Sequence, residues 1–239
     1  MREESSQSIK AIGARTLLAG LALSAFVFLT TNAMATVQVP DVIIIDGRNE
    51  SLETTPLAPY LSAHPKVMPR SDDPAADNWR GYVATWEILD GKLFLRKIDV
   101  AFRNSEALPD EDTRIIKNMI HNLFPDSRAV VATWYSGALV IPRGKLVKYV
   151  HMGYGSTYER CTIVTVNQGV VARKLDLSAE DFAKYRESQF QAFKRTAEYA
   201  TKLEEAKSYD PSYSDEFVES VLQSVEFERY LSIDFGKSE

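Results

Sequence analysis

The stretch WRGYVATWEILDGKLFLRKI, residues 79–98, decides the fold, because two runs of alternating apolar and polar residues flank an Asp-Gly pair. Asp90 and Gly91 suit the positive φ angles of a type I′ turn, whose twist matches that of the strands it joins. The stretch therefore predicts a β-hairpin. Its register is expected to pair Leu89 with Lys92, Ile88 with Leu93, Trp86 with Leu95, and Val83 with Ile98.

The alternation gives the two faces of this hairpin different environments. The side chains expected on the core side are Tyr82, Ala84, Trp86, Ile88, Leu93 and Leu95. The opposite side carries Thr85, Glu87 and Arg96. Glu87 and Arg96 are close enough on the diagonal to form an ion pair. The hairpin thus predicts an architecture but no activity.

The N-terminal 35 residues have the pattern of a secretory signal peptide. Three basic residues precede an apolar run from Leu17 to Leu29, and an Ala-Met-Ala cleavage site ends at Ala35. We expect cleavage after Ala35, a periplasmic or secreted product, and no stable membrane span after cleavage. An uncleaved membrane anchor is the alternative. The mature chain is then expected to comprise a sheet region, residues 36–177, and a C-terminal helical pair, residues 178–239.

Charge and cysteine content argue against a nucleic-acid partner and against an internal disulfide. The 239-residue chain has a net charge of −5, and loss of three basic and two acidic residues with the leader makes it −6. Its Lys and Arg residues are scattered among acids, whereas a nucleic-acid binder needs a basic face, so no nucleic-acid partner is expected. Cys161 is the only cysteine, so no internal disulfide forms. We expect Cys161 to be a buried small residue, with a reactive thiol as the alternative.

The rest of the sheet region reads as strands interrupted by one helix. An apolar run at 41–48 predicts a strand, and the proline-rich stretch to Asn78 predicts an irregular connection with a helical turn at 57–61. Pro109 and three acids predict a helix that begins near Leu108 and continues through Leu123. Later segments predict a hairpin at 130–141 around Ser136-Gly137, a short strand at 145–150, and a hairpin at 160–177 around 167–169.

The C-terminal part predicts two helices. Ser178 and Asp181 resemble a capping box at the start of a helix that runs to about Lys207. Ser214 is expected to cap a second helix, and residues 230–235 to add an edge strand. The predicted fold class is therefore α+β: a mostly antiparallel β-sheet of hairpins, with one inserted helix and two C-terminal helices packed on the sheet or on each other.

The strongest candidate site is the loop from His151 to Glu159. Its candidate binding residues are His151, Tyr154, Ser156, Tyr158 and Glu159, and its two glycines permit close approach of a ligand to the backbone. A tight structural connection between two strands is the alternative, because turns commonly need glycine. The loop lacks the Gly-Lys-Ser/Thr ending of a phosphate-binding loop.

Metal and nucleophilic chemistry have little support in the sequence. The three histidines are far apart, and neither a His-Glu-x-x-His nor a Gly-x-Ser-x-Gly motif occurs. We therefore predict no metal site and no cofactor. Glu87 and Glu159 lie near aromatic residues, as does the acid of a glycan-cleaving enzyme. Ion pairing with Arg96 and Arg160 is the simpler interpretation of these two carboxylates.

Aromatic residues are the other signal. Eleven Phe, Trp and Tyr residues lie from Trp79 to Tyr158, and these include all three tryptophans. Any that are exposed on one face, with Trp134 the leading candidate, would form a stacking platform for sugars or an anchor for a protein partner.

Several motifs resemble a group of uncharacterised bacterial proteins. They are WxGYxxTWEIxDGKL from Trp79, Leu123-Phe124-Pro125, Trp134-Tyr135-Ser136-Gly137, Ile141-Pro142-x-Gly144, and YVHMGYGS from Tyr149. The resemblance covers residues 42–172 and implies neither an activity nor a cofactor.

Two function hypotheses follow. The first is a non-catalytic periplasmic binding module for an envelope protein or glycan, acting through its sheet face and the loop at 151–159. The second is a cell-envelope glycan or peptide hydrolase, with Glu159 or Glu87 as acid or base and His151 assisting.

Overall fold

The computed structural model describes residues 38–65, 67, 78, 80–103, 114–125, 129–149 and 156–233. The predicted signal peptide therefore lies outside the described residues. The strands are β1 (Asp41–Ile45), β2 (Arg48–Leu52), β3 (Val83–Leu89), β4 (Lys92–Arg103), β5 (Arg114–Asn118), β6 (Val130–Val131), β7 (Gly137–Lys148), β8 (Thr157–Asn167) and β9 (Val170–Ser178). The helices are α2 (Ala58–Ala63), α3 (Ile120–Leu123), α4 (Ala179–Phe193), α5 (Ala197–Tyr209), α6 (Asp215–Val225) and α7 (Phe227–Tyr230). Of these helices, none is long and apolar enough to cross a membrane.

The fold is a mixed α+β arrangement in which one curved sheet is covered by helices. The strand order is β2-β1-β3-β4-β9-β8-β7, with β5 and β6 also pairing with β4. The expectation of a sheet made of hairpins needs one correction, because β1 and β3 are parallel. Parallel neighbours need a long crossover, which the irregular connection from β2 through α2 to β3 supplies.

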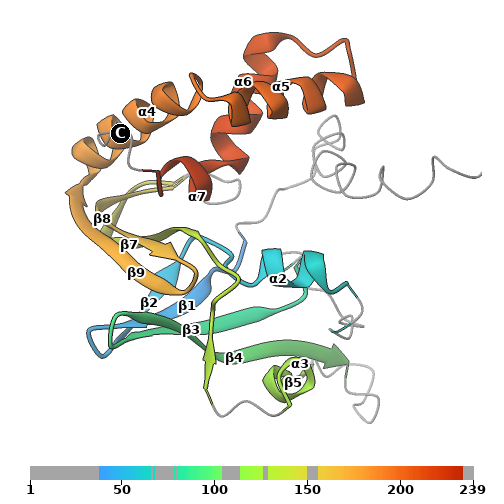
Figure 1. The fold of residues 1–239 in the computed structure, drawn as a ribbon. Coiled ribbons are helices and arrows are strands. Elements are labelled where there is room, and N and C mark those ends of the chain that lie inside the picture. Colours follow the sequence, from blue (N-terminus) through green and yellow to red (C-terminus); the bar gives the residue numbers. More distant parts are fainter. Residues whose placement is uncertain are drawn as a thin grey trace, which may run out of the picture.

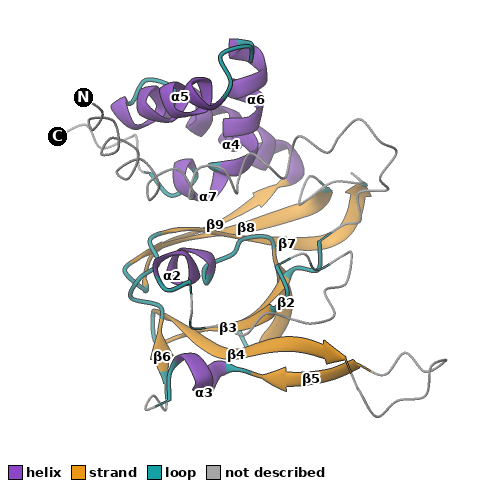
Figure 2. Cartoon of the chain, turned by 90° about the vertical axis from the view of Figure 1, so that its right-hand side faces the viewer, coloured by secondary structure: helices purple, strands orange, loops and turns teal. Residues whose placement is uncertain are grey.

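The sheet curls so that β7, β8 and β9 lie over β1, β3 and β4 (Figure 2). At one seam the Glu53 amide donates to the Val140 carbonyl at 2.9 Å. At the other seam the tips of two hairpins meet, because the Leu93 amide donates to the Gly169 carbonyl at 2.8 Å. Helices α4 to α7, the helical layer, lie on the outer side of β7–β9, with α4 and α7 against the strands and α5 and α6 farther out (Figure 1).

The 79–98 hairpin forms as expected, with one local difference. Asp90 and Gly91 have φ angles of 49° and 71°, which confirms the two positive-φ positions of the predicted turn. The pairs nearest the turn are confirmed, but a bulge between Thr85 and Trp86 places Val83 opposite Asp99 instead of Ile98. The bulge inserts one extra residue in one strand, which shifts every pair beyond it. The Glu87–Arg96 ion pair is confirmed at 2.5 Å.

Two hydrophobic cores lie on opposite faces of β7–β9. The inner core, between the two strand layers, contains Ile43, Trp86, Leu95, Leu139, Ile141 and Val164, among others. The outer core, between β7–β9 and the helical layer, contains Ala138, Val140, Cys161, Ile163, Phe190, Phe193 and Tyr230, among others. Alternation along β7 and β8 sends successive side chains to different cores. Cys161 is 6% exposed, which confirms the predicted burial.

A buried carboxylate fixes the inner core. Asp41 is fully buried and accepts hydrogen bonds from Arg80 at 3.1 Å, the Ala84 amide at 3.1 Å and Trp86 Nε1 at 3.0 Å. Burial raises the pKa of Asp41, while Arg80 and the hydrogen bonds act in the opposite direction. The donors satisfy a group that would be costly to bury alone, so Asp41 holds the start of β1 against β3.

The helix predicted from Leu108 to Leu123 is wrong over most of its described part. Residues 114–118 form β5, antiparallel to residues 99–103 of β4, and only Ile120–Leu123 are helical. Residues 108–113 lie outside the described residues. Asn118 makes the transition, because its Oδ1 accepts from the Ile98 and Ile120 amides, both at 3.1 Å. Pairing with the open edge of β4 thus overrides the helical spacing of the isoleucines.

The hairpin predicted at 130–141 is also wrong. Residues 130–131 pair with β4, whereas the strand that begins at Gly137 pairs with β8. The strand expected at 145–150 is not a separate element, because residues 145–148 form the end of β7. By contrast the hairpin at 160–177 is confirmed, with positive φ angles of 47° at Gln168 and 78° at Gly169.

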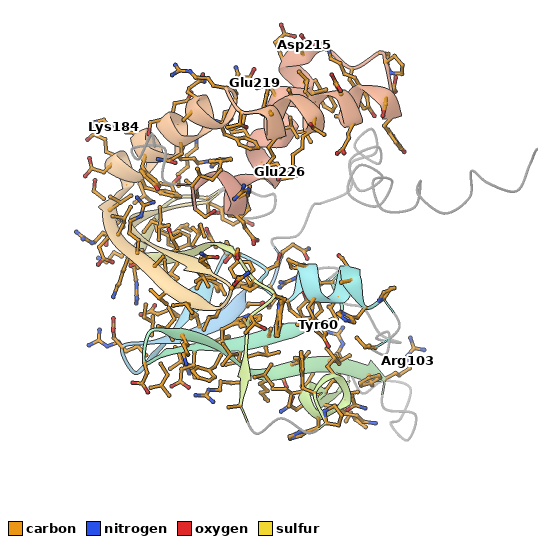
Figure 3. The ribbon with its side chains drawn as sticks, viewed as in Figure 1. Tyr60, Arg103, Lys184, Asp215, Glu219 and Glu226 are labelled. Atoms are coloured by element: carbon orange, nitrogen blue, oxygen red, sulfur yellow. The ribbon has the colours of Figure 1, made fainter. Side chains whose placement is uncertain are left out.

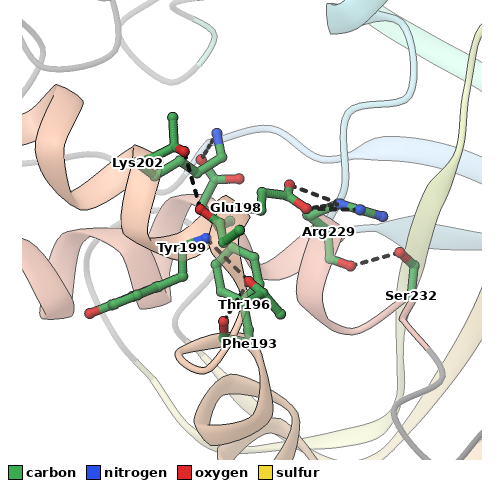
Figure 4. Close-up of polar contacts among 10 residues, drawn as sticks. Phe193, Thr196, Glu198, Tyr199, Lys202, Arg229 and Ser232 are labelled. Atoms are coloured by element: carbon green, nitrogen blue, oxygen red, sulfur yellow. Dashed lines mark hydrogen bonds and ion pairs between the residues drawn. The ribbon is translucent and has the colours of Figure 1, made fainter. Parts of the chain in front are cut away.

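The C-terminal helices begin where predicted but end differently. Ser178 and Ser214 cap α4 and α6 as expected, through bonds from the Asp181 and Phe217 amides. The single helix predicted to Lys207 is divided, because Thr196 is extended and caps α5. The start of the predicted edge strand at 230–235 is wrong, since Tyr230 ends α7 and is buried in the outer core. Figure 4 shows Arg229 of α7 bonded to Glu198 of α5, and one guanidinium nitrogen of Arg229 donates to Glu198 Oε2 at 2.8 Å.

Candidate functional site

The predicted loop at 151–159 is described only in part. His151 and Tyr154 lie outside the described residues, whereas Ser156 precedes β8 and both Tyr158 and Glu159 belong to it. Tyr158 is partly buried, and burial raises the pKa of its phenol, with the Glu53 carboxylate adding to this effect. The described end of this loop is therefore part of a strand.

Glu159 has a clear local role. Its carboxylate accepts the Lys145 amide at 3.0 Å across the β7–β8 ribbon. Gly144 has a φ of 77°, and a Cβ at that position would lie 2.5 Å from Glu159 Oε2. The positive φ favours glycine at this position, and it allows the Glu159 carboxylate to approach the backbone closely. These contacts favour a structural role for Glu159 in shaping an irregular part of β7.

Glu87 is likewise engaged by its neighbour. Its Oε2 accepts from Arg96 Nε at 2.5 Å, and the Arg96 guanidinium lies over the Phe94 ring at 4.7 Å from the centroid. Glu87 and Glu159 lie on different strands, β3 and β8, and they accept hydrogen bonds from different donors, Arg96 and the Lys145 amide. The geometry therefore favours ordinary ion pairing for Glu87 over acid–base work with Glu159.

Trp134 belongs to an aromatic cluster that also contains Tyr60, His64 and Phe124. Tyr60 lies at the centre, with its ring centroid 4.3 Å from His64 and 4.9 Å from both Phe124 and Trp134. The Phe124 and Trp134 rings are stacked, with an interplanar angle of 11°. The three aromatic residues are partly exposed and His64 is exposed. The cluster is thus an accessible rim of the inner core.

Three elements that are distant in sequence build this cluster. Tyr60 and His64 come from α2 and its C-terminal end, Phe124 follows α3, and Trp134 follows β6. The Trp134 Nε1 donates to the Pro56 carbonyl at 2.9 Å, and His64 Nδ1 is 2.9 Å from the Tyr60 carbonyl. Figure 3 shows Tyr60 beside α2 in the lower half of the view, whereas the labelled residues of the helical layer lie in the upper half. These bonds orient the Trp134 and His64 rings, and ring packing orients the other two, as a recognition surface requires.

Sequence reasoning missed two carboxylates between the sheet and the helical layer. Burial raises the pKa of Glu53 to about 8, although Arg186 lowers it in part. Burial also raises the pKa of Glu228 to about 6, and Glu228 Oε1 accepts the Thr55 amide at 2.8 Å. Thr55 follows β2 and Glu228 lies on α7, so only the tertiary fold brings this pair together. Glu53 also follows β2, and its electrostatic partner Arg186 lies on α4.

The chemistry of the remaining candidates is limited. Burial raises the pKa of the Cys161 thiol to about 12, so the thiol stays protonated near neutral pH. Within the described parts of the chain, no group of three or more His, Cys, Asp or Glu side chains could hold a metal ion.

No family model matches the chain, and neither the curated proteins nor the solved structures include a significant match.

Proposed function

We propose that this protein is an exported, non-catalytic binding module of the bacterial periplasm, which engages an envelope protein or glycan through the aromatic cluster. The observation that carries the proposal is the set of partly exposed rings around Tyr60, held by packing and hydrogen bonds. Aromatic rings stack on sugars, and they dominate the energetics of protein interfaces. Either ligand class fits a rigid aromatic rim.

The state of the two candidate acids supports binding over hydrolysis. Glu87 is held by Arg96, and Glu159 accepts a backbone amide within its own ribbon. A typical glycan hydrolase needs a pair of carboxyl groups that flank the glycosidic bond to be cleaved, and the one that acts as general acid has a raised pKa. Burial raises the pKa of Glu53 to about 8 and that of Glu228 to about 6. These two carboxyl groups lie where the helical layer meets the sheet, away from Glu87 and Glu159 in the sequence.

Export is supported by the basic, apolar and Ala-Met-Ala segments that end at Ala35. Sequencing the N-terminus of the protein purified from its own cells tests this part directly. A start at residue 36 supports export with cleavage after Ala35, and a start at Met1 contradicts the cleavage.

Binding is tested by affinity capture from cross-linked periplasm with the tagged chain 36–239. Wild type is compared with Trp134→Ala and Tyr60→Ala, and with Tyr209→Ala, which removes a ring that is 48% exposed on α5. We expect one stoichiometric partner or glycan that both cluster variants lose and Tyr209→Ala retains. Equal capture by all four folded proteins, or no specific capture, would overturn the proposal.

A further inference from the structure

The β7–β8 arm, defined as residues 143–149 and 156–160, carries exposed apolar side chains. Leu146 is 49% exposed, Val147 is 62% exposed and Tyr149 is 55% exposed. β9 pairs with β8 only from Arg160 onward, so the earlier residues of β8 have β7 as their described neighbour. The arm therefore continues past the end of the three-stranded part of the sheet as a two-stranded ribbon.

The arm is also basic, whereas the whole chain is acidic. It contains Arg143, Lys145, Lys148 and Arg160 against the single carboxylate of Glu159, a net charge of +3, while the chain has −5. Arg143 is paired with Glu50. Lys145 and Lys148 are exposed, and the described acids form no ion pair with either of them.

The lysines of the helical layer behave differently. Lys184, Lys194 and Lys202 each pair with a carboxylate, at 2.6, 2.7 and 2.7 Å respectively. Lys207 pairs with Asp215, and Figure 3 labels Lys184 and Asp215 on this layer. Unlike these four helical-layer lysines, Lys145 and Lys148 of the arm have no ion pair with a described carboxylate, and they lie beside exposed aliphatic side chains.

We propose that the arm docks the protein on an anionic lipid bilayer. Leu146 and Val147 enter the interfacial zone, and Lys145 and Lys148 meet the headgroup phosphates, because the long lysine stems allow the ammonium groups to stay at the polar surface. Exposed Tyr149 has the amphipathic ring that such interfaces favour. This surface is separate from the aromatic cluster, so the inference goes beyond the proposed binding function.

Side-chain chemistry favours a bilayer over an acidic protein. Lysine is depleted at protein interfaces, and Leu and Val are under-represented among the residues that carry their binding energy. A bilayer requires no matching pocket, and each lysine near its anionic surface strengthens binding. Aliphatic residues flanked by lysines are therefore better suited to lipid.

Vesicle co-sedimentation of the chain 36–239 tests the inference. We expect binding to vesicles of mixed phosphatidylcholine and phosphatidylglycerol, weakened by added salt, and little binding to phosphatidylcholine alone. The Lys145→Gln, Lys148→Gln double variant should bind about 30-fold more weakly, as the loss of two surface lysines implies. Lys184→Gln with Lys207→Gln makes the same charge change on the helical layer and should bind as wild type.

A second variant separates the apolar contribution from charge. Leu146→Ser with Val147→Ser should reduce binding to the mixed vesicles while the circular dichroism spectrum is unchanged, because both positions are exposed. Four outcomes would overturn the inference: no vesicle binding, equal binding to neutral vesicles, equal loss in both lysine double variants, or retention on immobilised polyglutamate without vesicle binding. The last outcome would assign the arm to an acidic protein partner.

Discussion

The sheet region and the helical layer place the same types of residue in different environments. In the helical layer, Phe190, Phe193 and Tyr230 are buried against each other, and lysines are paired with nearby carboxylates. In the sheet region, Tyr60 on α2 and Trp134 after β6 form an accessible rim. The helical layer thus covers the outer face of β7–β9, whereas the surfaces suited to binding remain on the sheet region.

The comparison also separates two kinds of buried acid. Asp41 in the inner core has three donors to its carboxylate, including a guanidinium. Glu53, beside the helical layer, has Arg186 as its principal electrostatic partner. Burial raises the pKa of both carboxyl groups, so both make stability depend on pH, but the donors around Asp41 oppose this rise more extensively than Arg186 does for Glu53.

The largest effect is expected from Asp41→Ala. The substitution leaves Arg80 buried without its counter-ion and leaves Trp86 Nε1 without its acceptor. The free energy of unfolding should fall by about 3–5 kcal/mol in urea denaturation. Glu180→Ala is the control, since Glu180 is 77% exposed on α4 and the loss of its ion pair with Lys184 should cost less than about 1 kcal/mol. Similar losses for the two variants would contradict the role assigned to Asp41.

Phe193→Leu should have an intermediate effect. It removes the ring contacts of Phe193 with Tyr199 and Tyr230, whose centroids are 5.7 and 6.1 Å away. We expect a loss of about 1–2 kcal/mol, with faster amide hydrogen exchange in the helical layer than in β3 and β4. Equal acceleration throughout the described strands and helices would show that the two cores unfold as one unit.

Stability should fall as the pH rises from about 4.5 to about 8. The folded pKa of Glu53, about 8, lies above its ordinary value of 4.5, so folding favours the protonated acid. Its stabilising contribution is complete below pH 4.5 and is lost as the pH rises through 8. Glu53→Gln should flatten this part of the thermal stability profile by on the order of 1 kcal/mol after allowance for solvent screening. The exposed Glu204→Gln should leave the profile unchanged, and an unaltered profile for Glu53→Gln would refute the assignment.

The smallest effect is expected from Glu198→Ala. Glu198 and Arg229 tie α5 to α7 (Figure 4), but their side chains are 36% and 48% exposed. Exposed ion pairs contribute at most about 1 kcal/mol, and salt screens them. Urea denaturation at low and high salt measures this contribution, and a loss comparable to that of Phe193→Leu would mean that this pair organises the helical layer.

The sequence predicted best the features that depend on a few adjacent residues. Asp90-Gly91 indicated its turn through backbone preference, and Ser178 and Ser214 indicated helix starts through side-chain capping. Partners from distant segments were not predictable in this way. β5 replaced a helix because β4 offered an open edge, and β1 joined β3 in parallel across a long connection.

The candidate site follows the same division. Trp134 was predicted as a binding residue from aromatic density, but its neighbours Tyr60 and Phe124 come from other segments. Glu53 carries no local motif, and its raised pKa arises from its burial in the folded chain. Chemistry that depends on tertiary burial leaves no periodic signal in the sequence.

Site-specific photo-crosslinking tests most directly the claim that the sheet region, and not the helical layer, carries the ligand surface. Tyr60→p-benzoylphenylalanine places the probe in the aromatic cluster, and Tyr209→p-benzoylphenylalanine places it on exposed α5. After irradiation in cells, we expect a covalent protein or glycan adduct from position 60 and none from position 209. An adduct from position 209 alone, or equal adducts from both positions, would contradict the account.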